Sequence, residues 1–311
     1  MIDFISPFKL KELGILGMNA RNIDFISRYN SRKYYPLVDD KLQTKLLAEE
    51  HGINTPELLL VIRSQSDIKR YKDRLNSLSS FVIKPARGSG GKGIMVIVGK
   101  DGHMFIKSSG AKIDFDEISR HLSNTLAGLH SLSGDQDVAI VETLIELDPI
   151  FEPYSYQGVP DIRIIVFRGY PVMAMLRLST KASDGKANLH QGAVGVGIDI
   201  KSAKAINAVV NGVKITHHPD TKHSFEAIEI PNWPELLELA SSCYDITHLG
   251  YFGADIVLDK NRGAMLLELN ARPGLAIQIA NSKGLLKPLK EIQKIKTIKR
   301  DPRARVSYVL D

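Results

Sequence analysis

Three oxygen-bearing side chains near the C-terminal end of the sequence could together bind a divalent cation. Asp255 lies in the run GADIVLD, and Glu268 and Asn270 lie in LLELN. Residues two apart on a strand point to one face, and a hairpin turning at 260–263 would bring Asp255 alongside the other two. Mg²⁺ prefers a few carboxylates together with phosphate oxygens. The alternative is a strand whose polar face meets solvent, but the intervening leucines indicate burial, where a carboxylate needs a partner.

A glycine-rich loop is the second feature with a possible chemical role. Residues 81–98, FVIKPARGSGGKGIMVIV, contain the pattern G-x-G-x-x-G at Gly88–Gly93. The residues that follow are β-rich, which predicts a hairpin flap rather than the strand-to-helix turn of a dinucleotide fold, and Lys92 is not followed by the Ser or Thr of a Walker loop. Glycine N–H groups can close over phosphates, above a cation from Lys84 at a half-exposed strand end. The alternative is a mobile hairpin without a ligand.

The elements that position these residues are a mixture of helices and strands. Helices are expected at residues 39–53, 66–78 with Ser66 as N-cap, 115–130 and 231–250. Strands are expected at residues 55–62, 81–84, 94–98, 101–107, 137–145, 161–179 as a hairpin, and 251–274 as a second hairpin. Residues 146–160 and 181–199 are expected as loops. The many antiparallel signals favour an α+β class over a doubly wound α/β fold.

In their order and context these motifs resemble those of the ATP-grasp ligases. The motifs are VIKPARGSGGKGI, VETLIE, DIRIIVF, KANLHQG, GADIVLD and LLELNARPGL. The sequence is most similar to the RimK-like branch, and within it to proteins called α-L-glutamate ligase-like, over roughly residues 40–284. The resemblance implies an ATP-grasp fold in which two α+β subdomains clasp a nucleotide. The expected parts are residues 1–39 as a short segment in place of the usual pre-domain, 40–142 as the central subdomain with the flap, 143–290 as the C-terminal subdomain with the metal site, and 291–311 as a basic tail.

The resemblance also implies a nucleotide site. The matching residues are Lys41, Lys84, Gly88, Ser89, Gly90, Gly91, Lys92, Gly93, Glu142, Thr143, Ile145, Asp161, Lys186 and Asn188. Among them, Glu142 and Thr143 match the hinge that holds adenine through backbone groups, with Ile145 as an apolar wall. Lys186 stands where arginine is usual, and the ribose contact is either Glu146 or Asp148.

The resemblance further implies catalytic arginines and bound ions. Arg163 and Arg177 match arginines that neutralise the transferring phosphoryl group or the substrate carboxylate. Arg272, in NARPG, is unusual for the family and adds charge near the acyl site. The implied cofactors are ATP and Mg²⁺ at Asp255, Glu268 and Asn270, with a second Mg²⁺ ion expected and Mn²⁺ as a substitute.

The implied activity is ATP-dependent formation of an amide or peptide bond from a carboxylate and an amine through an acyl phosphate. An amino acid such as glutamate would be added to a small-molecule or peptide acceptor. Phosphoryl transfer needs positioning and charge neutralisation rather than a protein nucleophile. Two alternatives stay open, which are an ATP-grasp kinase of a small molecule and a nucleotide-binding partner protein with little turnover.

Composition bounds the setting in which this chemistry would take place. The chain has 311 residues, a net charge of +6 and a single cysteine, Cys243, which is expected in the core and excludes an internal disulfide. The basic residues are scattered except in the run KIKTIKRDPRAR at 294–305, which is expected as a solvated tail, with a functional patch as the alternative. No apolar run is long enough to span a bilayer and no signal peptide is evident, so a cytoplasmic location without membrane or nucleic-acid partners is expected.

A homo-oligomer or a protein partner could complete the acceptor site. His190 is a candidate acceptor contact, whereas His217, His218 and His223 are expected on loop surface.

Overall fold

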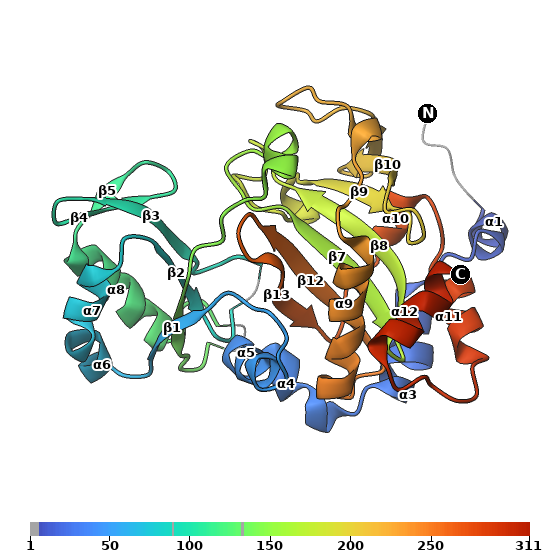
Figure 1. The fold of residues 1–311 in the computed structure, drawn as a ribbon, viewed down its shortest axis with the longest axis horizontal. Coiled ribbons are helices and arrows are strands. Elements are labelled where there is room, and N and C mark those ends of the chain that lie inside the picture. The colour runs from blue at the N-terminus through green and yellow to red at the C-terminus, as the bar shows by residue number, and fades with distance from the viewer. Residues whose placement is uncertain (1–5, 89, 132–133) are drawn as a thin grey trace. The chain divides into compact units, whose positions relative to one another are not determined.

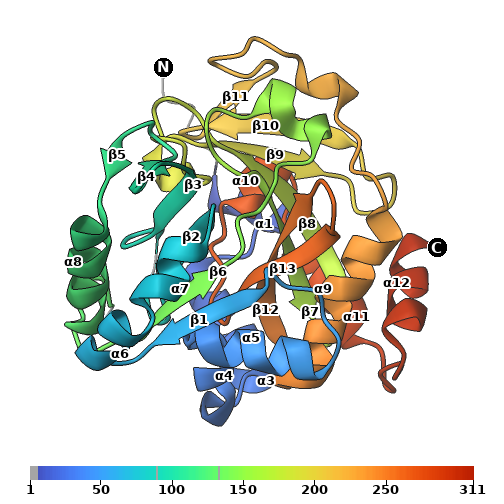
Figure 2. The ribbon, with the colours of Figure 1, turned by 60° about the vertical axis from the view of Figure 1, so that its left-hand side comes forward.

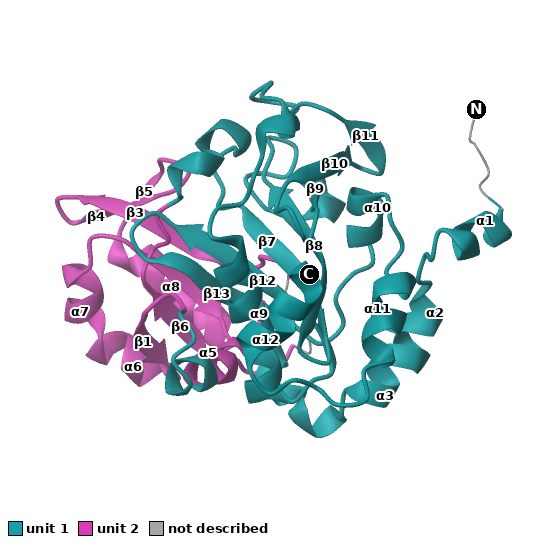
Figure 3. Ribbon diagram, turned by 45° about the vertical axis from the view of Figure 1, so that its right-hand side comes forward, with its two compact units in different colours: residues 1–39, 47–54, 147–311 teal, residues 40–46, 55–146 magenta. Residues whose placement is uncertain are grey.

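The computed structural model describes residues 6–88, 90–131 and 134–311. It is an α+β structure with two antiparallel sheets (Figure 1), as the sequence predicts. The chain divides into two compact units (Figure 3): unit 2 comprises Asp40–Leu46 and Thr55–Glu146, and unit 1 comprises the residues up to Asp39, Leu47–Asn54 and Leu147–Asp311. Helix α5 (Lys41–Glu50) contributes residues to both units.

Unit 2 is built on a six-stranded sheet covered by three helices. The strands in spatial order are β1 (Leu58–Ile62), β6 (Ala139–Glu142), β2 (Phe81–Pro85), β3 (Met95–Asp101), β4 (Met104–Lys107) and β5 (Lys112–Ile113). The helices are α6 (Gln65–Arg70), α7 (Lys72–Ser77) and α8 (Phe115–Leu126). Ile68, Leu75 and Leu122 of these helices belong to one buried cluster with residues of the sheet. Figures 1 and 2 show the three helices beside that sheet.

The expected N-cap at Ser66 is wrong. Helix α6 begins after Ser64, whose side chain accepts from the Asp67 N–H at 3.3 Å. The Asp67 carboxylate in turn accepts from the Ser64 N–H at 3.0 Å. This reciprocal capping box satisfies two N-terminal amide groups, which a cap two residues later would leave unpaired.

Unit 1 is built on a seven-stranded sheet. Its strands in spatial order are β11 (Val213–Ile215), β10 (Ala205–Val210), β9 (Val194–Ile198), β8 (Tyr170–Leu178), β7 (Asp161–Phe167), β12 (Tyr251–Asp259) and β13 (Gly263–Asn270). Helix α9 (Trp233–Thr247) packs on one face through Leu236 and Ala240. The opposite face is covered by N-terminal and C-terminal segments through Phe25, Leu285 and Leu289.

The remaining helices of unit 1 are short. They are α1 (Pro7–Glu12), α2 (Met18–Ala20), the π-helix η1 (Arg21–Ile26), α3 (Ser27–Tyr29), α4 (Pro36–Asp39), α10 (Ile277–Asn281), α11 (Leu286–Gln293) and α12 (Pro302–Leu310). Short 3₁₀ helices are η2 (Arg32–Tyr34), η3 (Pro149–Tyr154), η4 (Leu189–Gln191) and η5 (Phe225–Ala227). Within the ranges that the structure describes, no helix is long and apolar enough to cross a membrane.

Part of the segment 181–199, expected as a loop, forms the buried strand β9 instead. The sequence interpretation was wrong here because the segment is rich in glycine, and glycine weakens a strand. A Cβ on Gly197 would lie 2.4 Å from the Ala280 carbonyl oxygen of α10. The glycine is therefore there to admit a neighbouring backbone rather than to form a turn.

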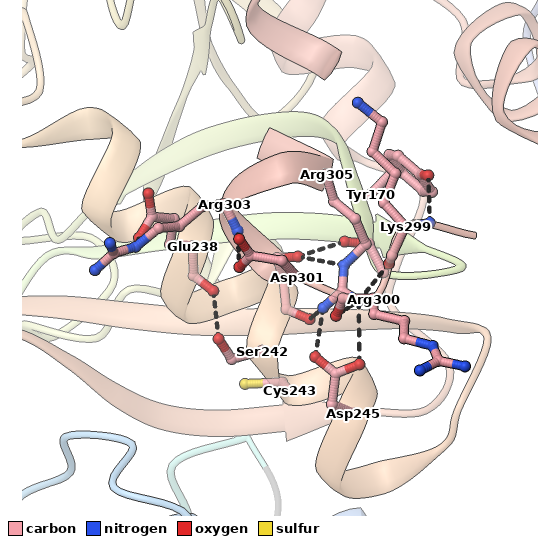
Figure 4. Close-up of polar contacts among 12 residues, drawn as sticks. Tyr170, Glu238, Ser242, Cys243, Asp245, Lys299, Arg300, Asp301, Arg303 and Arg305 are labelled. Atoms are coloured by element: carbon pink, nitrogen blue, oxygen red, sulfur yellow. Dashed lines mark hydrogen bonds and ion pairs between the residues drawn. The ribbon is translucent and has the colours of Figure 1, made fainter. Parts of the chain in front are cut away.

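The basic run 294–305 has exposed cations, as expected for a solvated tail, with the exception of Arg305. It ends in helix α12, and Arg305 is only 1% exposed. The Arg305 guanidinium donates to the Asp245 carboxylate, to Ser241 Oγ at 2.9 Å and to the carbonyls of Lys299 and Arg300 at 3.0 Å (Figure 4). A buried arginine is tolerated because these acceptors replace water.

Two single-residue expectations also have clear outcomes. Cys243 is fully buried in α9, as predicted, and burial raises the pKa of its thiol to about 12. His218, expected on loop surface, is instead fully buried. Its Nδ1 accepts from the N–H groups of Asp220 and Thr221, and its Nε2 donates to the Ser179 carbonyl oxygen at 3.0 Å. The ring therefore connects its own loop to Ser179, the residue after β8.

Candidate functional site

In unit 2, a buried carboxylate lies between two buried lysines. Glu142 ends strand β6 and is 3% exposed. Its Oε2 lies 2.5 Å from Nζ of Lys84, on the adjacent strand β2, and its Oε1 lies 3.0 Å from Nζ of Lys45, on α5. Burial acts to raise the pKa of Glu142, but the two lysines outweigh it and lower the pKa. The carboxylate is therefore ionised, and the three residues carry one net positive charge.

This arrangement adds a residue that the sequence interpretation missed and changes the environment of two that it named. Lys45 follows Lys41 by four residues, so both lie on one face of α5, and that spacing was the available signal. Lys84 is 8% exposed rather than half-exposed. Lys41 Nζ donates to the Gly88 carbonyl oxygen at 2.7 Å, which ties α5 to the glycine loop.

The residues after Glu142 leave the sheet and form a short connection. The Thr143 N–H donates to the Glu57 carbonyl oxygen at 3.0 Å, and Thr143 Oγ1 accepts from the Glu57 N–H at 3.0 Å. Ile145 is half-buried. The predicted hinge is thus anchored to the segment that leads into β1.

The glycine loop joins β2 to β3, which pair antiparallel, so strand, loop and strand follow as the sequence predicts. Gly90, Gly91 and Gly93 all have positive φ, between 62° and 75°. A Cβ on Gly93 would lie 2.4 Å from the His130 ring, whereas a Cβ on Gly90 would meet nothing within 4 Å. Lys92 is exposed. Ser89 lies outside the described residues.

In unit 1, strand register places six candidate residues on one face of four adjacent strands. Asp255 on β12 is directly opposite Arg163 on β7 and Glu268 on β13. Asp161 is opposite Arg177 on β8. Directly opposite residues share a face, as do residues two apart, so Asn270 shares it too. The pairing of β12 with β13 shifts register immediately after Asp255, and such irregularities redirect side chains near functional sites.

Asp255 is the acceptor at the centre of this cluster. Its Oδ1 accepts from Arg163 Nε at 2.7 Å, and its Oδ2 accepts from Arg163 Nη2 at 2.6 Å and Arg177 Nη2 at 2.8 Å. Asn270 Nδ2 donates to the same Oδ2 at 3.2 Å. Arg177 Nε also donates to Asp161 Oδ1 at 2.6 Å. Asp255 therefore orients both arginines.

Burial and ion pairing act on the two aspartates with different outcomes. Burial acts to raise the pKa of Asp255, but Arg163 and Arg177 lower it to about 2. Burial raises the pKa of Asp161 to about 6, because Arg177 only partly offsets it and the Asp255 charge adds to it. The three carboxylates, of Asp161, Asp255 and Glu268, outnumber the two guanidinium groups, so the cluster has a formal charge of −1.

The donor set on this face suits a hard cation. Asp255, Glu268 and Asn270 offer carboxylate and amide oxygens, and the excess negative charge favours a positive ion. In the part of the chain that the structure describes, no group of three His, Cys, Asp or Glu residues is arranged to hold a metal. A Mg²⁺ ion here would thus draw on two protein carboxylates, with phosphate oxygens and water as further ligands, which Mg²⁺ accepts.

The other predicted residues of unit 1 lie on loops. The Arg272 guanidinium lies 5.3 Å from the centroid of the Tyr35 ring. Lys186 pairs with Asp184 at 3.5 Å, and the Asn188 side chain accepts from the exposed His190 N–H at 3.0 Å. These side chains contact other protein groups, and the contacts give no indication of a ligand.

Comparison with known proteins gives one family. A family model described as sugar-transfer associated ATP-grasp matches residues 20–294. No curated protein matches the sequence.

Solved structures similar to this chain include enzymes whose titles name them as ligases or synthetases. D-cycloserine synthetase DcsG has 13% identity and a TM-score of 0.48, with 99% of this chain and 83% of that chain covered. D-alanine–D-alanine ligase from Bacillus anthracis, complexed with ATP, has 15% identity and a TM-score of 0.44, with coverages of 89% and 66%. The ATP-grasp ligase PsnB, complexed with minimal precursor, Mg and ADP, has 14% identity and a TM-score of 0.44, with coverages of 90% and 62%. The chain thus spans somewhat less than two thirds of the PsnB chain.

Proposed function

The chain belongs to the sugar-transfer associated ATP-grasp family, and from that premise we propose that it is an ATP-dependent carboxylate–amine ligase. The proposal includes the finer resemblance to the RimK-like branch, with an amino acid such as glutamate added to a small-molecule or peptide acceptor. The observation that carries it is the charged row on one face of β8, β7, β12 and β13, where two arginines and three carboxylates meet.

The proposed reaction has two bond-forming steps. An oxygen of the substrate carboxylate attacks the γ-phosphorus of ATP, ADP leaves, and an acyl phosphate forms. The amine then attacks the acyl carbon, and phosphate leaves with the bonding electrons as the amine loses a proton. Neither step requires a protein nucleophile, because phosphoryl transfer depends on positioning and on neutralising charge.

The residues of each unit would serve different parts of this chemistry. In unit 2, Lys84 and the N–H groups of Gly90 and Gly91 would bind nucleotide phosphates. In unit 1, Arg163 and Arg177 would neutralise the transferring phosphoryl group or the substrate carboxylate. Bound Mg²⁺ would add positive charge at the phosphates, held by Asp255, Glu268 and Asn270.

The decisive experiment measures product formation with ATP, Mg²⁺ and a pool of amino acids by mass spectrometry. A ligase forms a new amide and releases phosphate only when an acid and an amine are present together. Arg177→Gln should abolish the product, whereas the exposed control Arg74→Gln should retain it. ADP formation that depends on an alcohol, without phosphate release, would contradict the proposal and indicate a kinase.

A further inference from the structure

The net positive charge of this chain comes from two segments of unit 1. Residues 6–33 contain six Lys or Arg and two acidic residues, and residues 283–303 contain eight and two. Together the segments have a net charge of +10, so the rest of the chain has −4 out of the total of +6. The overall basic character therefore resides in these 49 residues.

The two segments form one layer on the sheet of unit 1. Leu16 and Phe25 from the first belong to the same buried cluster as Leu289 and Ile292 from the second. The Leu286 N–H donates to the Gly14 carbonyl oxygen at 2.9 Å. Figure 3 shows α2 and α3 next to α11, with α1 beyond them toward the N-terminus. We refer to residues 6–33 and 283–303 as the basic layer.

The basic layer also exposes large apolar side chains. They are Phe8 (81% exposed), Leu10 (37%), Leu13 (46%), Met18 (65%) and Ile23 (62%). Helix α1 has no buried residue at all. A six-residue helix is marginal in water without packing, and contact of its apolar residues with a surface outside the chain would stabilise it. Lys9 and Lys11 alternate with them along the same helix.

We propose that the basic layer binds the surface of an anionic lipid membrane. Exposed lysines would pair with lipid headgroups while Phe8 and Met18 insert between them, the combination by which peripheral segments bind membranes. Nine of the fourteen cations are lysines and thirteen are exposed. Such binding needs no spanning helix. This proposal differs from the expectation, made from the sequence, that the chain has no membrane partner. That expectation was based on the lack of a spanning segment and on the scattered basic residues.

A lipid surface fits these features better than nucleic acid does. Nucleic-acid binding without a groove-reading motif relies on aromatic side chains on which bases stack. The large exposed apolar residues of the basic layer are mostly aliphatic, and Phe8 is its one aromatic member among them in the described residues. Aliphatic side chains between lysines gain more from an acyl boundary than from stacked bases.

Co-sedimentation of the full chain with vesicles tests the proposal. The vesicles contain phosphatidylcholine alone, or with about a third phosphatidylglycerol to give a negative surface. The wild-type chain should bind only the anionic vesicles, and binding should weaken when salt rises from ~0.1 to ~0.5 M. The triple variant Lys287→Glu, Lys290→Glu and Lys296→Glu should lower the partition coefficient roughly 100-fold or more. Phe8→Ser with Met18→Ser should lower it roughly tenfold.

Matched controls lie elsewhere on the surface. The charge control reverses Lys69, Lys201 and Lys214 to Glu, and the apolar control changes the exposed Leu129 and Val213 to Ser. All of these variants should fold, since the changed side chains are exposed. Failure of the wild-type chain to bind anionic vesicles overturns the proposal. An equal loss of vesicle binding in the control variants also overturns it. So does binding of an oligonucleotide that depends on the lysines of the basic layer, if the chain does not bind vesicles.

Discussion

Replacing Glu142 with Gln should destabilise the protein more than replacing either lysine that pairs with it. Lys84 and Lys45 lie 2.5 and 3.0 Å from its two oxygens, and all three side chains are at most 11% exposed. At an effective dielectric constant of about 20, each attraction is about 6 kcal/mol before desolvation is subtracted. The cost of desolvating the three charges offsets much of this attraction. The effect of a substitution on stability therefore depends mainly on which buried charge it leaves without a partner.

The three variants leave different charges behind. Glu142→Gln leaves two buried lysines without a counter-charge, and the expected loss is about 3–5 kcal/mol in the free energy of unfolding. Lys84→Met or Lys45→Met leaves one buried lysine paired with Glu142, and the expected loss is about 1–3 kcal/mol. Loss of Lys84 has this cost because the lysine is 8% exposed, rather than half-exposed as the sequence suggested, and pairs with Glu142.

Urea denaturation followed by circular dichroism measures these losses, and titration calorimetry measures ATP affinity on the folded variants. Lys84→Met should abolish measurable ATP binding at a modest stability cost, because the proposal has its charge act on phosphates. Equal destabilisation by all three variants would refute the charge argument. Normal ATP affinity in folded Lys84→Met would remove this lysine from the phosphate site.

Three further predictions concern unit 1. Asp255→Asn and Glu268→Gln should lower ATP-dependent turnover far more than Asn270→Ala, with partial rescue by high Mg²⁺ or by Mn²⁺ in a metal titration. Burial is the chief cause of the lowered pKa of His218. As the pH falls below about 6.5, the unfolded chain binds a proton at His218 before the folded chain does, so the free energy of unfolding should fall. In His218→Gln the melting temperature should depend less on pH. Arg305→Met should cost about 3 kcal/mol in urea denaturation, because buried acceptors lose their donor.

These predictions have distinct controls and contradicting outcomes. Arg303 lies on the same helix but is 81% exposed at its side chain and pairs with Glu238 at 3.3 Å. Arg303→Met should change stability by less than about 0.5 kcal/mol, and similar losses for both arginines would contradict the burial argument. Wild-type metal dependence in Asp255→Asn would place the metal elsewhere. A pH dependence unchanged by His218→Gln would assign it to another group.

Sequence patterns were most informative where backbone geometry leaves little choice. The period of two on a strand places Glu268 and Asn270 on one face, and the hairpin brings Asp255 beside them, as the register shows. The β-rich residues after Gly93 correctly indicated a strand rather than a helix. In these cases local geometry alone decides which side chains meet.

Sequence patterns failed where partners come from distant parts of the chain. The run KIKTIKRDPRAR has the composition of a solvated tail, and only the fold shows that Arg305 meets Asp245, sixty residues away. His218 is polar and lies among turn residues, yet its acceptor is the Ser179 carbonyl oxygen. Burial of a polar group depends on acceptors that composition does not locate.

The shared role of Asp255 leads to a last prediction, which separates the two carboxylates of the metal set. Asp255 accepts from both Arg163 and Arg177, whereas Glu268 is opposite it on β13. A guanidinium has five N–H donors, so Arg163, which directs two at Asp255, is oriented by the aspartate rather than exhausted by it. Asp255→Asn replaces an anionic acceptor with a neutral amide and loosens both arginines as well as the metal. Saturating Mg²⁺ should restore metal binding in both variants. Turnover of Asp255→Asn should nevertheless stay below that of Glu268→Gln under this condition. Equal turnover of the two variants under that condition would show that Asp255 acts through the metal alone.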